Sequence, residues 1–336
     1  KQVHSQTLLP MVEGLLQTVG RSCGELDAIA VSHGPGSFTG VRIGVSCVKG
    51  IALPKNIPCV GVSTLEAIAY SGIPYEDAIL CAVMDARCGQ VYNALFRSEG
   101  GALHRLTEDR ALPIKELEGE LAAFVGRKHC VSCGNGTDAL SLVMMAWEIK
   151  EGDVVFVPDF TFFASAEVVA FEGATPVFVD VDERSFNIDP DKLEQAICAV
   201  EQEGKLRPRA VVAVDLFGQP ADYRRIEEIC RRHNLLLLED GAQGFGGMLD
   251  GRRACSFGDA AATSFFPAKP LGCYGDGGAV FTNDDNLAEL LRSLRIHGKS
   301  PVSKYDNIRI GINSRLDTLQ AAVLQVKFEA FRQHEL

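Results

Sequence analysis

The sequence lacks any hydrophobic run long enough to cross a membrane, and its first residues do not form a secretory signal. A membrane-spanning helix needs about 20 consecutive apolar residues, and no segment of the 336-residue chain approaches that length. The opening segment, KQVHSQTLLP, has no basic stretch followed by an apolar one. We therefore expect a protein without membrane association.

Positive charge is also scarce. The chain has 33 Lys and Arg against 44 Asp and Glu, a formal net charge of −11 with a pI near 5.2. Because nucleic-acid phosphates are bound by clustered Lys and Arg, we expect no direct nucleic-acid binding. With 46% hydrophobic and 23% charged residues, the composition is that of a globular chain with room for more than one domain.

No set of cysteines has the spacing of a zinc site. The 11 cysteines are odd in number and scattered from Cys23 to Cys273, which indicates reduced thiols in the cytoplasm and not a disulfide framework. Cys130 and Cys133 form the one Cys-x-x-Cys pair, and no second pair or nearby His completes a tetrahedron. We expect two buried strand cysteines here and no metal site.

The first 97 residues alternate short β-branched runs with helical stretches. This pattern predicts a helix over 41–53 and strands over 27–32, 58–63, 78–86 and 89–96. Residues 97–114 are polar and lose the periodicity, so we expect a domain boundary in or just after them.

A longer β/α alternation begins at Leu117. Strands are expected at 129–134, 153–160, 175–182, 209–218 and 235–240, and helices at 117–126, 136–149, 161–173, 191–200, 221–234 and 313–336. Such a pattern predicts an α/β fold with a mainly parallel sheet and helices on both faces. Ligands of these sheets bind at the carboxyl ends of the strands.

The segment GNGTDAL, residues 134–140, is a glycine-bearing turn from a strand into a helix. Free backbone N–H groups and the positive end of the helix dipole make such a turn suitable for holding a phosphate. Glycine turns before helices are common, so a purely structural turn is the alternative.

The segment LLLLEDGAQ places Glu239, Asp240 and Gln243 at the carboxyl end of an apolar strand. A carboxylate there can keep a pyridine nitrogen protonated, which makes a pyridoxal ring an electron sink. A solvated acid pair that caps the next helix is the alternative.

The segment SFFPAKPLGCYGDGG, residues 264–278, sets Lys269 between two prolines and before several glycines. Backbone shape, and not helix propensity, therefore fixes the position of this lysine. A surface-loop lysine is the alternative for this motif alone.

Together the three motifs resemble those of the DegT/StrS sugar aminotransferases, which have the aspartate aminotransferase fold. The resemblance runs from about Leu117 to the end of the chain, with the motifs in the family's order and spacing. It implies that Lys269 binds pyridoxal 5′-phosphate (PLP) as a Schiff base and later shuttles a proton. It also implies that Asp240 pairs with the pyridinium nitrogen and that Gln243 lies beside the phenolic oxygen of the ring.

The same resemblance assigns the remaining cofactor contacts. Gly136, Thr137 and Ser264 would hold the phosphate, and Phe162 would stack on the ring face. Asn313, in GINSRLD, would reach across a homodimer interface to the neighbour's phosphate.

The family resemblance further implies transamination of a keto sugar nucleotide, with glutamate as the amino donor. Family members with His in place of the lysine are dehydratases, and this sequence has the lysine. Relative to the family, we expect this chain to lack an N-terminal segment and the C-terminal small domain, which puts its turnover in question. Gly241 stands where the family usually has Ala.

The first 115 residues resemble a fragment of TsaB, the partner protein in bacterial synthesis of threonylcarbamoyladenosine on tRNA. The resemblance is carried by HSQTLLP, by SHGPGSFTGVRIG (32–44) and by MDARCGQVY (84–92). It implies a partial actin-like or sugar-kinase-like α/β unit that binds a TsaD-type protein and has no catalysis of its own. The glycine loop could cradle an anion, but a tight structural turn is the preferred interpretation.

The chain therefore resembles a fusion of two partial domains, at 1–115 and 116–336, joined near residues 116–120. Three hypotheses follow: a PLP-dependent aminotransferase that truncation has weakened or inactivated, a TsaB-like binding module with a passenger, and an inactive chimaeric chain. The third predicts poor solubility, because half-domains expose sheet edges and apolar faces.

Overall fold

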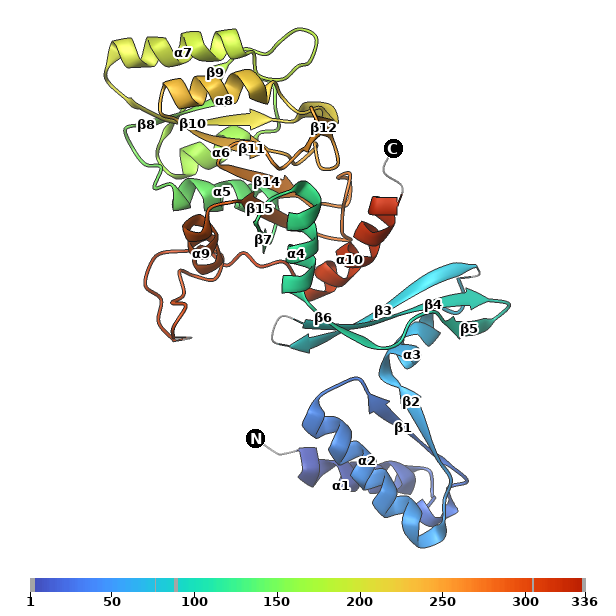
Figure 1. Cartoon of the computed structure of the whole chain (residues 1–336). Helices are drawn as coiled ribbons and strands as arrows, with labels where there is room; N and C mark the ends of the chain where they lie inside the picture. Colours follow the sequence, from blue (N-terminus) through green and yellow to red (C-terminus); the bar gives the residue numbers. More distant parts are fainter. Residues whose placement is uncertain (1–3, 76, 88–89, 304, 334–336) are drawn as a thin grey trace. The chain divides into compact units, whose positions relative to one another are not determined.

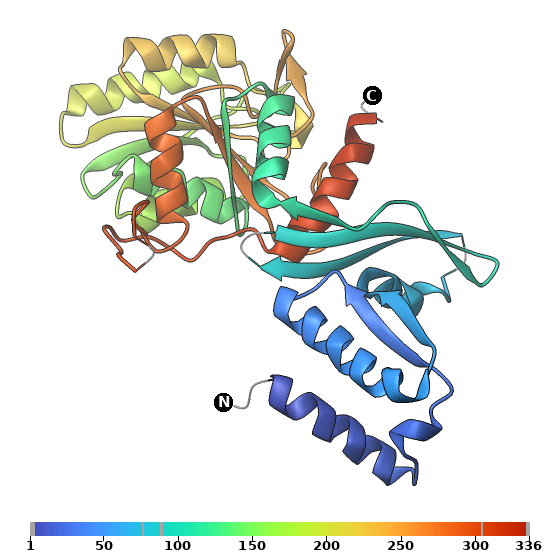
Figure 2. The same ribbon diagram turned by 60° about the horizontal axis from the view of Figure 1, so that its bottom comes forward.

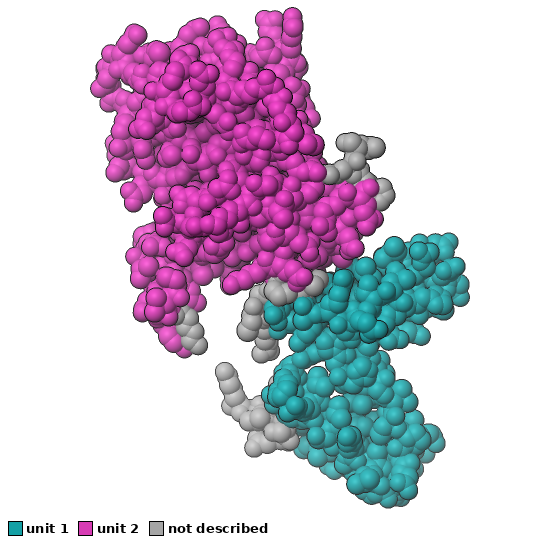
Figure 3. Space-filling view, viewed as in Figure 1, with its two compact units in different colours: residues 1–113 teal, residues 114–336 magenta. Residues whose placement is uncertain are grey.

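The computed structural model describes residues 4–75, 77–87, 90–303 and 305–333. It divides into two compact units, unit 1 over Lys1–Pro113 and unit 2 over Ile114–Leu336 (Figure 3). This division lies two residues before the boundary expected from the sequence. No helix in the described ranges is long and apolar enough to span a membrane.

Unit 1 contains two small sheets (Figure 1). Strands β1 and β2 pair in parallel, and β4 pairs in antiparallel fashion with each of β3, β5 and β6. The predicted strand-loop-helix turn of the glycine loop is confirmed, because β1 leads into α2, whose first turn is capped by the hydroxyl of Ser37. The elements are α1 (His4–Thr18), β1 (Ile29–Gly34), α2 (Phe38–Ala52), β2 (Cys59–Ser63), α3 (Thr64–Ala69), β3 (Ala78–Arg87), β4 (Gln90–Glu99), β5 (Ala102–Arg105) and β6 (Arg110–Pro113).

The polar segment 97–114, for which the sequence pattern predicted no strand beyond a domain boundary, contains two strands. Residues 102–105 and 110–113 are strands β5 and β6, and both pair with β4. The side chains of β5 alternate between exposed and half-buried, which explains why the segment is polar and carries little hydrophobic signal. Cys88 and Gly89, within the MDARCGQVY motif, lie outside the described residues.

Unit 1 buries few residues. Its apolar cluster contains five buried residues, Leu65, Ala69, Ala82, Ala94 and Phe96, where α3 packs against the antiparallel sheet. Most described side chains of α1 and α2 are at least partly exposed, whereas Ala52 is buried. A core of this size supplies little hydrophobic stabilisation on its own.

Unit 2 is built on a seven-stranded sheet with the order β7-β15-β14-β11-β10-β8-β9. Strand β15 is antiparallel to both of its neighbours, and the other adjacent pairs are parallel, so the sheet is mixed. Its strands are β7 (His129–Cys133), β8 (Asp153–Pro158), β9 (Thr175–Val179), β10 (Arg207–Val214), β11 (Leu236–Asp240), β14 (Ala260–Ser264) and β15 (Gly278–Thr282), and a separate hairpin comprises β12 (Met248–Leu249) and β13 (Arg252–Arg253).

Helices cover both faces of this sheet (Figures 1 and 2). Alternate residues of β8 point to opposite faces, as the pleat requires: Val155 and Val157 join the core under α5, α6 and α9, and Val154 and Phe156 join the core under α7 and α8. Helices α4 and α10 cover the β7–β15 end of the second face. The helices are α4 (Ile114–Val125), α5 (Gly136–Ala146), α6 (Ala164–Phe171), α7 (Pro190–Glu203), α8 (Tyr223–Arg232), α9 (Asp285–Leu294) and α10 (Thr318–Gln333).

The last helix begins at Thr318, and not at residue 313 as the sequence pattern predicted. Residues before it are held in an extended loop, because the Ser314 N–H donates to the Arg295 carbonyl and Asn313 forms a β-bridge with Ile296. Residues 334–336 lie outside the described part of the chain. The prediction of two buried strand cysteines is confirmed, since Cys130 and Cys133 lie in β7 with at most 2% exposure.

Buried charges anchor α4 to the sheet. Glu118 accepts hydrogen bonds from the Ser132 N–H (2.9 Å) and hydroxyl (2.8 Å), and its Oε1 is 2.7 Å from Nη1 of Arg295. An ion pair of this kind is costly to break from one side, because the remaining charge is left buried.

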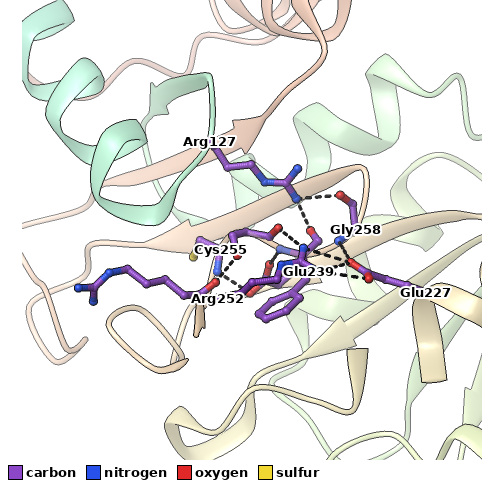
Figure 4. A network of polar contacts seen from close by, with 9 residues as sticks. Arg127, Glu227, Glu239, Arg252, Cys255 and Gly258 are labelled. Atoms are coloured by element: carbon purple, nitrogen blue, oxygen red, sulfur yellow. Dashed lines mark hydrogen bonds and ion pairs between the residues drawn. The ribbon is translucent and has the colours of Figure 1, made fainter. Parts of the chain in front are cut away.

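A second polar network fixes the segment between β13 and β14 (Figure 4). Arg127 donates to the carbonyls of Phe257 (2.6 Å) and Gly258 (2.7 Å). Glu239, fully buried in β11, accepts the N–H groups of Cys255 and Phe257. The network therefore holds this segment against the strand that ends at Asp240.

Candidate active site

A cavity of about 690 Å³ opens at the carboxyl edge of the unit 2 sheet. This volume is in the range of small-molecule and cofactor sites. Residues from strands β11 and β14, from the start of α5 and from the lysine loop line it together. Seven of the eight residues predicted from the sequence are among its lining, namely Gly136, Thr137, Phe162, Asp240, Gln243, Ser264 and Lys269.

The turn into α5 is shaped to receive an anion. Asn135 caps the helix by accepting the Asp138 N–H on its Oδ1 (2.8 Å). Within the described ranges, the N–H groups of Gly136 and Thr137 have no such partner, and they stand at the positive end of the helix dipole. A Cβ on Gly136 would lie 2.7 Å from the Ser264 Cβ, so the glycine allows the turn to approach the third predicted phosphate ligand.

Asp240 ends strand β11 with only 5% of its surface exposed. The Ser165 hydroxyl donates to its Oδ2 (2.8 Å), and the Ala242 N–H donates to its Oδ1 (3.2 Å). Burial raises the pKa of this carboxyl, while the two donors and the positive charge of Lys269 oppose that rise. The donors therefore favour the ionised form inside an apolar wall.

Lys269 lies on the loop that follows β14. Its N–H donates to the Phe266 carbonyl (2.9 Å), which closes a tight turn between the two prolines. The lysine charge acts on Asp240, yet among the described residues no carboxylate lies within ion-pair distance of its Nζ. Both residues thus line the same cavity without forming an ion pair within the described part of the chain.

Gln243 is oriented by a backbone group. Its Oε1 accepts the N–H of Phe217 (2.9 Å), and because an N–H can bond only to the amide oxygen, the assignment of oxygen and nitrogen is fixed. Phe217 lies in η4 (Leu216–Gly218) with a φ of 56°, a conformation unfavourable for a bulky residue. The side-chain amide of Gln243 is therefore held in place from outside the cavity.

Phe162 lines the cavity with 67% of its surface exposed. Asn313 is the one predicted residue that the structure does not bring into the cavity. Its proposed role concerns a second copy of the chain, so it stays a prediction.

Two residues of this site were missed in the sequence. Asn135 could have been found, because an Asn three residues before Asp138 at the start of an apolar run is a helix-cap signal. Ser165 had no such signal, since it meets Asp240 across 75 positions of sequence. Thr161 extends this contact, with its hydroxyl 3.0 Å from that of Ser165.

The arrangement fits a flat aromatic cofactor that has a phosphate at one end and a ring nitrogen at the other. The α5 turn and Ser264 would receive the phosphate, Asp240 the ring nitrogen, Gln243 a ring oxygen and Lys269 a carbonyl carbon. Each contact matches the hydrogen-bonding capacity of its residue.

Solved structures support the fold of unit 2. A DegT DnrJ EryC1 StrS aminotransferase from Brucella abortus is 54% identical to this chain with a TM-score of 0.64, and the match covers 66% of this chain and 59% of that one. The S. venezuelae DesV structure, in complex with a ketimine intermediate, is 42% identical with a TM-score of 0.61, covering 66% and 57%. The α/β fold with a mixed sheet is therefore that of type I aminotransferases.

Curated relatives give the same result. A UDP-2-acetamido-2-deoxy-3-oxo-D-glucuronate aminotransferase from Pseudomonas aeruginosa is 50% identical over 220 residues, which are 66% of this chain and 59% of the relative. A UDP-N-acetyl-3-dehydro-alpha-D-glucosamine 3-aminotransferase from Acidithiobacillus ferrooxidans is 45% identical over 214 residues, 64% and 56% of the two chains. The chain thus spans less than two thirds of the length of these relatives.

Two family models match the chain. The model of tRNA N6-adenosine threonylcarbamoyltransferase, TsaD, matches residues 1–209, a range that includes all of unit 1 but also strands β7, β8 and β9 and the start of β10 in the unit 2 sheet. The DegT/DnrJ/EryC1/StrS aminotransferase model matches residues 110–335, which contain the cavity and every residue that lines it. Through these residues, about two thirds of its length, the chain belongs to the DegT/DnrJ/EryC1/StrS aminotransferase family.

Proposed function

We propose that unit 2 binds PLP and is the core of an aminotransferase that acts on a keto sugar nucleotide, with glutamate as amino donor. One observation supports this above the others: a single cavity presents the amine of Lys269 and the buried carboxyl of Asp240 without pairing them. When bound, PLP supplies an electron-withdrawing ring through which an amino group can pass between donor and acceptor.

The residues of this chain would have distinct tasks. Lys269 would hold the cofactor covalently and, once released, move a proton at its Nζ. Asp240, kept ionised by Ser165 and Ala242, would hold a proton on the ring nitrogen. Gly136, Thr137 and Ser264 would anchor the phosphate, and Phe162 would restrict the ring to one plane.

The substrate class follows from the named relatives, which act on UDP-linked oxo sugars. A homodimer, with Asn313 directed to the neighbouring phosphate, is part of the proposal.

Cofactor attachment can be tested with the purified chain and added PLP. We expect an absorption band that borohydride bleaches, with the reduced cofactor located on Lys269 by peptide mass spectrometry. Lys269→Ala should remove the band, and Lys327→Ala, a matched lysine of α10, should keep it. A colourless mixture, or label spread over several lysines, would refute the proposal. Glutamate added alone should then shift the band, because donor deamination is the first half of transamination.

For unit 1 we propose a TsaB-like, non-catalytic binding role toward a TsaD-type protein, joined to the aminotransferase unit by fusion of two partial domains. The family-model match over residues 1–209 supports a relation to this tRNA-modifying system. An apolar groove of about 580 Å³ between α1 and α2 offers a surface for a protein partner, lined by Leu8, Leu9, Phe38, Thr39, Arg42, Ile43, Ser46 and Cys47.

This second role is separable from the first. The intact chain should bind a purified bacterial TsaD-type protein in isothermal calorimetry, and Lys269→Ala should not change the affinity. Phe38→Asp, which charges the groove, should weaken binding, while Tyr75→Asp, equally exposed but outside the groove, should not. Failure to bind, or equal loss in both variants, would contradict the proposed surface.

A further inference from the structure

Behind the cavity, two carboxyl groups are buried against each other. Asp215 follows β10 and Glu239 lies in β11, and neither exposes any surface. Their carboxyl groups are within hydrogen-bonding reach of each other. Asp215 does not line the cavity, although Val214 and Asp240 beside it do.

The hydrogen bonds around this pair leave one acceptor without a donor. Asp215 Oδ1 accepts from the Tyr223 hydroxyl (2.7 Å) and the Ala221 N–H (3.3 Å). Among the described residues, Oδ2 of Asp215 receives no N–H or O–H group. Both oxygens of Glu239 already accept backbone N–H groups.

This oxygen is buried. Gly244 lies close to it, because a Cβ placed on that glycine would be 2.4 Å from Asp215 Oδ2. The ring of Tyr223, which donates to Oδ1, is itself stacked on Phe257 at 4.3 Å. Two ionised carboxylates in contact at such a site would repel each other, and one oxygen would remain unsatisfied.

We propose that Asp215 and Glu239 share one proton, which forms a hydrogen bond between them, and that this singly charged pair positions Asp240 for the ring nitrogen. The positioning part rests on the proposed function. The pair adjoins Asp240 through the backbone, because Glu239 precedes Asp240 in β11 and the Asp215 N–H donates to the Asp240 carbonyl (3.0 Å). The shared proton also removes one of the three negative charges that Asp215, Glu239 and Asp240 would otherwise place at the ends of β10 and β11.

The charges around the pair agree with this assignment. Burial raises the pKa of both carboxyls, that of Asp215 to about 7. The titratable groups that face them are Tyr223 on α8, Asp240 on β11 and Cys255 before β14. Two cations act nearby: the charge of Arg127 interacts with that of Glu239, and the charge of Lys269 interacts with that of Asp240. None of these cations forms an ion pair with the two carboxyls within the described ranges.

Infrared spectroscopy of the intact chain without cofactor tests the shared proton. A protonated carboxyl has a C=O stretching band that carboxylates lack, and at about pH 6, below the pKa of Asp215, the exposed acids are already ionised. We expect one such band in the wild type and its loss in both Asp215→Asn and Glu239→Gln. Asp222→Asn, which changes an exposed neighbouring acid, should keep it.

The two variants should differ in stability. In Asp215→Asn the new amide can donate to Glu239 in place of the proton, so this variant should unfold at the wild-type urea midpoint. In Glu239→Gln the NH₂ group of the new amide faces a backbone N–H that has lost its acceptor. This variant should therefore unfold at a lower urea concentration than the wild type. A wild type without the band, or a band that survives Asp215→Asn and disappears in Asp240→Asn, would overturn the inference. Because no cofactor is added, these outcomes are independent of whether PLP binds.

Discussion

Replacing Ser165 by Ala should destabilise unit 2 more at high pH than at low pH. The Ser165 hydroxyl donates to Asp240 Oδ2 at 2.8 Å, and both side chains are buried. A hydrogen bond to a charged group contributes about 1.5–3 kcal/mol, and one to a neutral group about 0.5–1.5 kcal/mol. The penalty should therefore be about 0.5–1.5 kcal/mol where Asp240 is protonated and about 1.5–3 kcal/mol where it is ionised.

The direction follows from linkage. Burial already raises the folded-state pKa of Asp240, and Ser165 opposes that rise, so the substitution raises this pKa further. A carboxyl with a raised folded pKa contributes stability at low pH that is lost as the pH rises from its unfolded to its folded pKa. Because the substitution moves the folded pKa upward, that loss continues to a higher pH in the variant, so the difference from wild type grows with pH.

Urea unfolding at about pH 5 and about pH 8 measures this difference. Trp147 is the single tryptophan of the chain and packs against the core of unit 2, so its fluorescence follows that unit. Ser293→Ala is the matched control, because this buried hydroxyl donates to a neutral acceptor, the Lys299 carbonyl, at 2.7 Å. Equal penalties for Ser165→Ala at both pH values, or the same pH slope in the control, would refute the charge-assisted role.

Further substitutions test the packing of unit 2. Gly136→Ala places a Cβ 2.7 Å from Ser264 and should weaken PLP binding in an absorption titration, while Gly119→Ala, which has open space in α4, should gain about 0.5–1 kcal/mol in urea unfolding. Gly241→Ala places a Cβ 2.6 Å from the Cys255 Sγ and should cost about 1–3 kcal/mol. Adding Cys255→Ala should recover most of that loss, a coupling that a double-mutant cycle measures. Glu118→Ala should cost about 3–5 kcal/mol, because the mostly buried Arg295 loses its carboxylate partner and keeps only Ser132; a loss below about 1 kcal/mol in urea unfolding would contradict this.

Features encoded by neighbouring residues were predictable from the sequence. The helix-strand alternation of unit 2 and the acids at the end of β11 follow from short stretches of chain, because side-chain period and strand polarity are local properties. The loop that holds Lys269 between prolines is likewise encoded by a few neighbouring residues. The same motifs carry the family resemblance.

Features that depend on distant pairing were not predictable. Strand β7 pairs with β15 across roughly 150 residues, and nothing in either segment specifies that β15 runs antiparallel. Strands β5 and β6 were missed because short, half-exposed strands carry polar residues. The start of α10 was misplaced because the Ser314 N–H bonds to Arg295, a contact that outweighs the helical pattern of residues 313–317.

The Gly241 position shows how a contact distant in sequence can require a small residue. The sequence alone gives no reason for a glycine directly after Asp240. In the structure, the thiol of Cys255, fully buried, occupies the space that an alanine methyl would need. The same segment presents the Cys255 N–H to Glu239. Because Gly241 has no side chain, Cys255 can lie beside it and cover the carboxyl pair behind the cavity. An alanine at 241 would press on this segment, and the backbone donor that fixes Glu239 would be displaced with it.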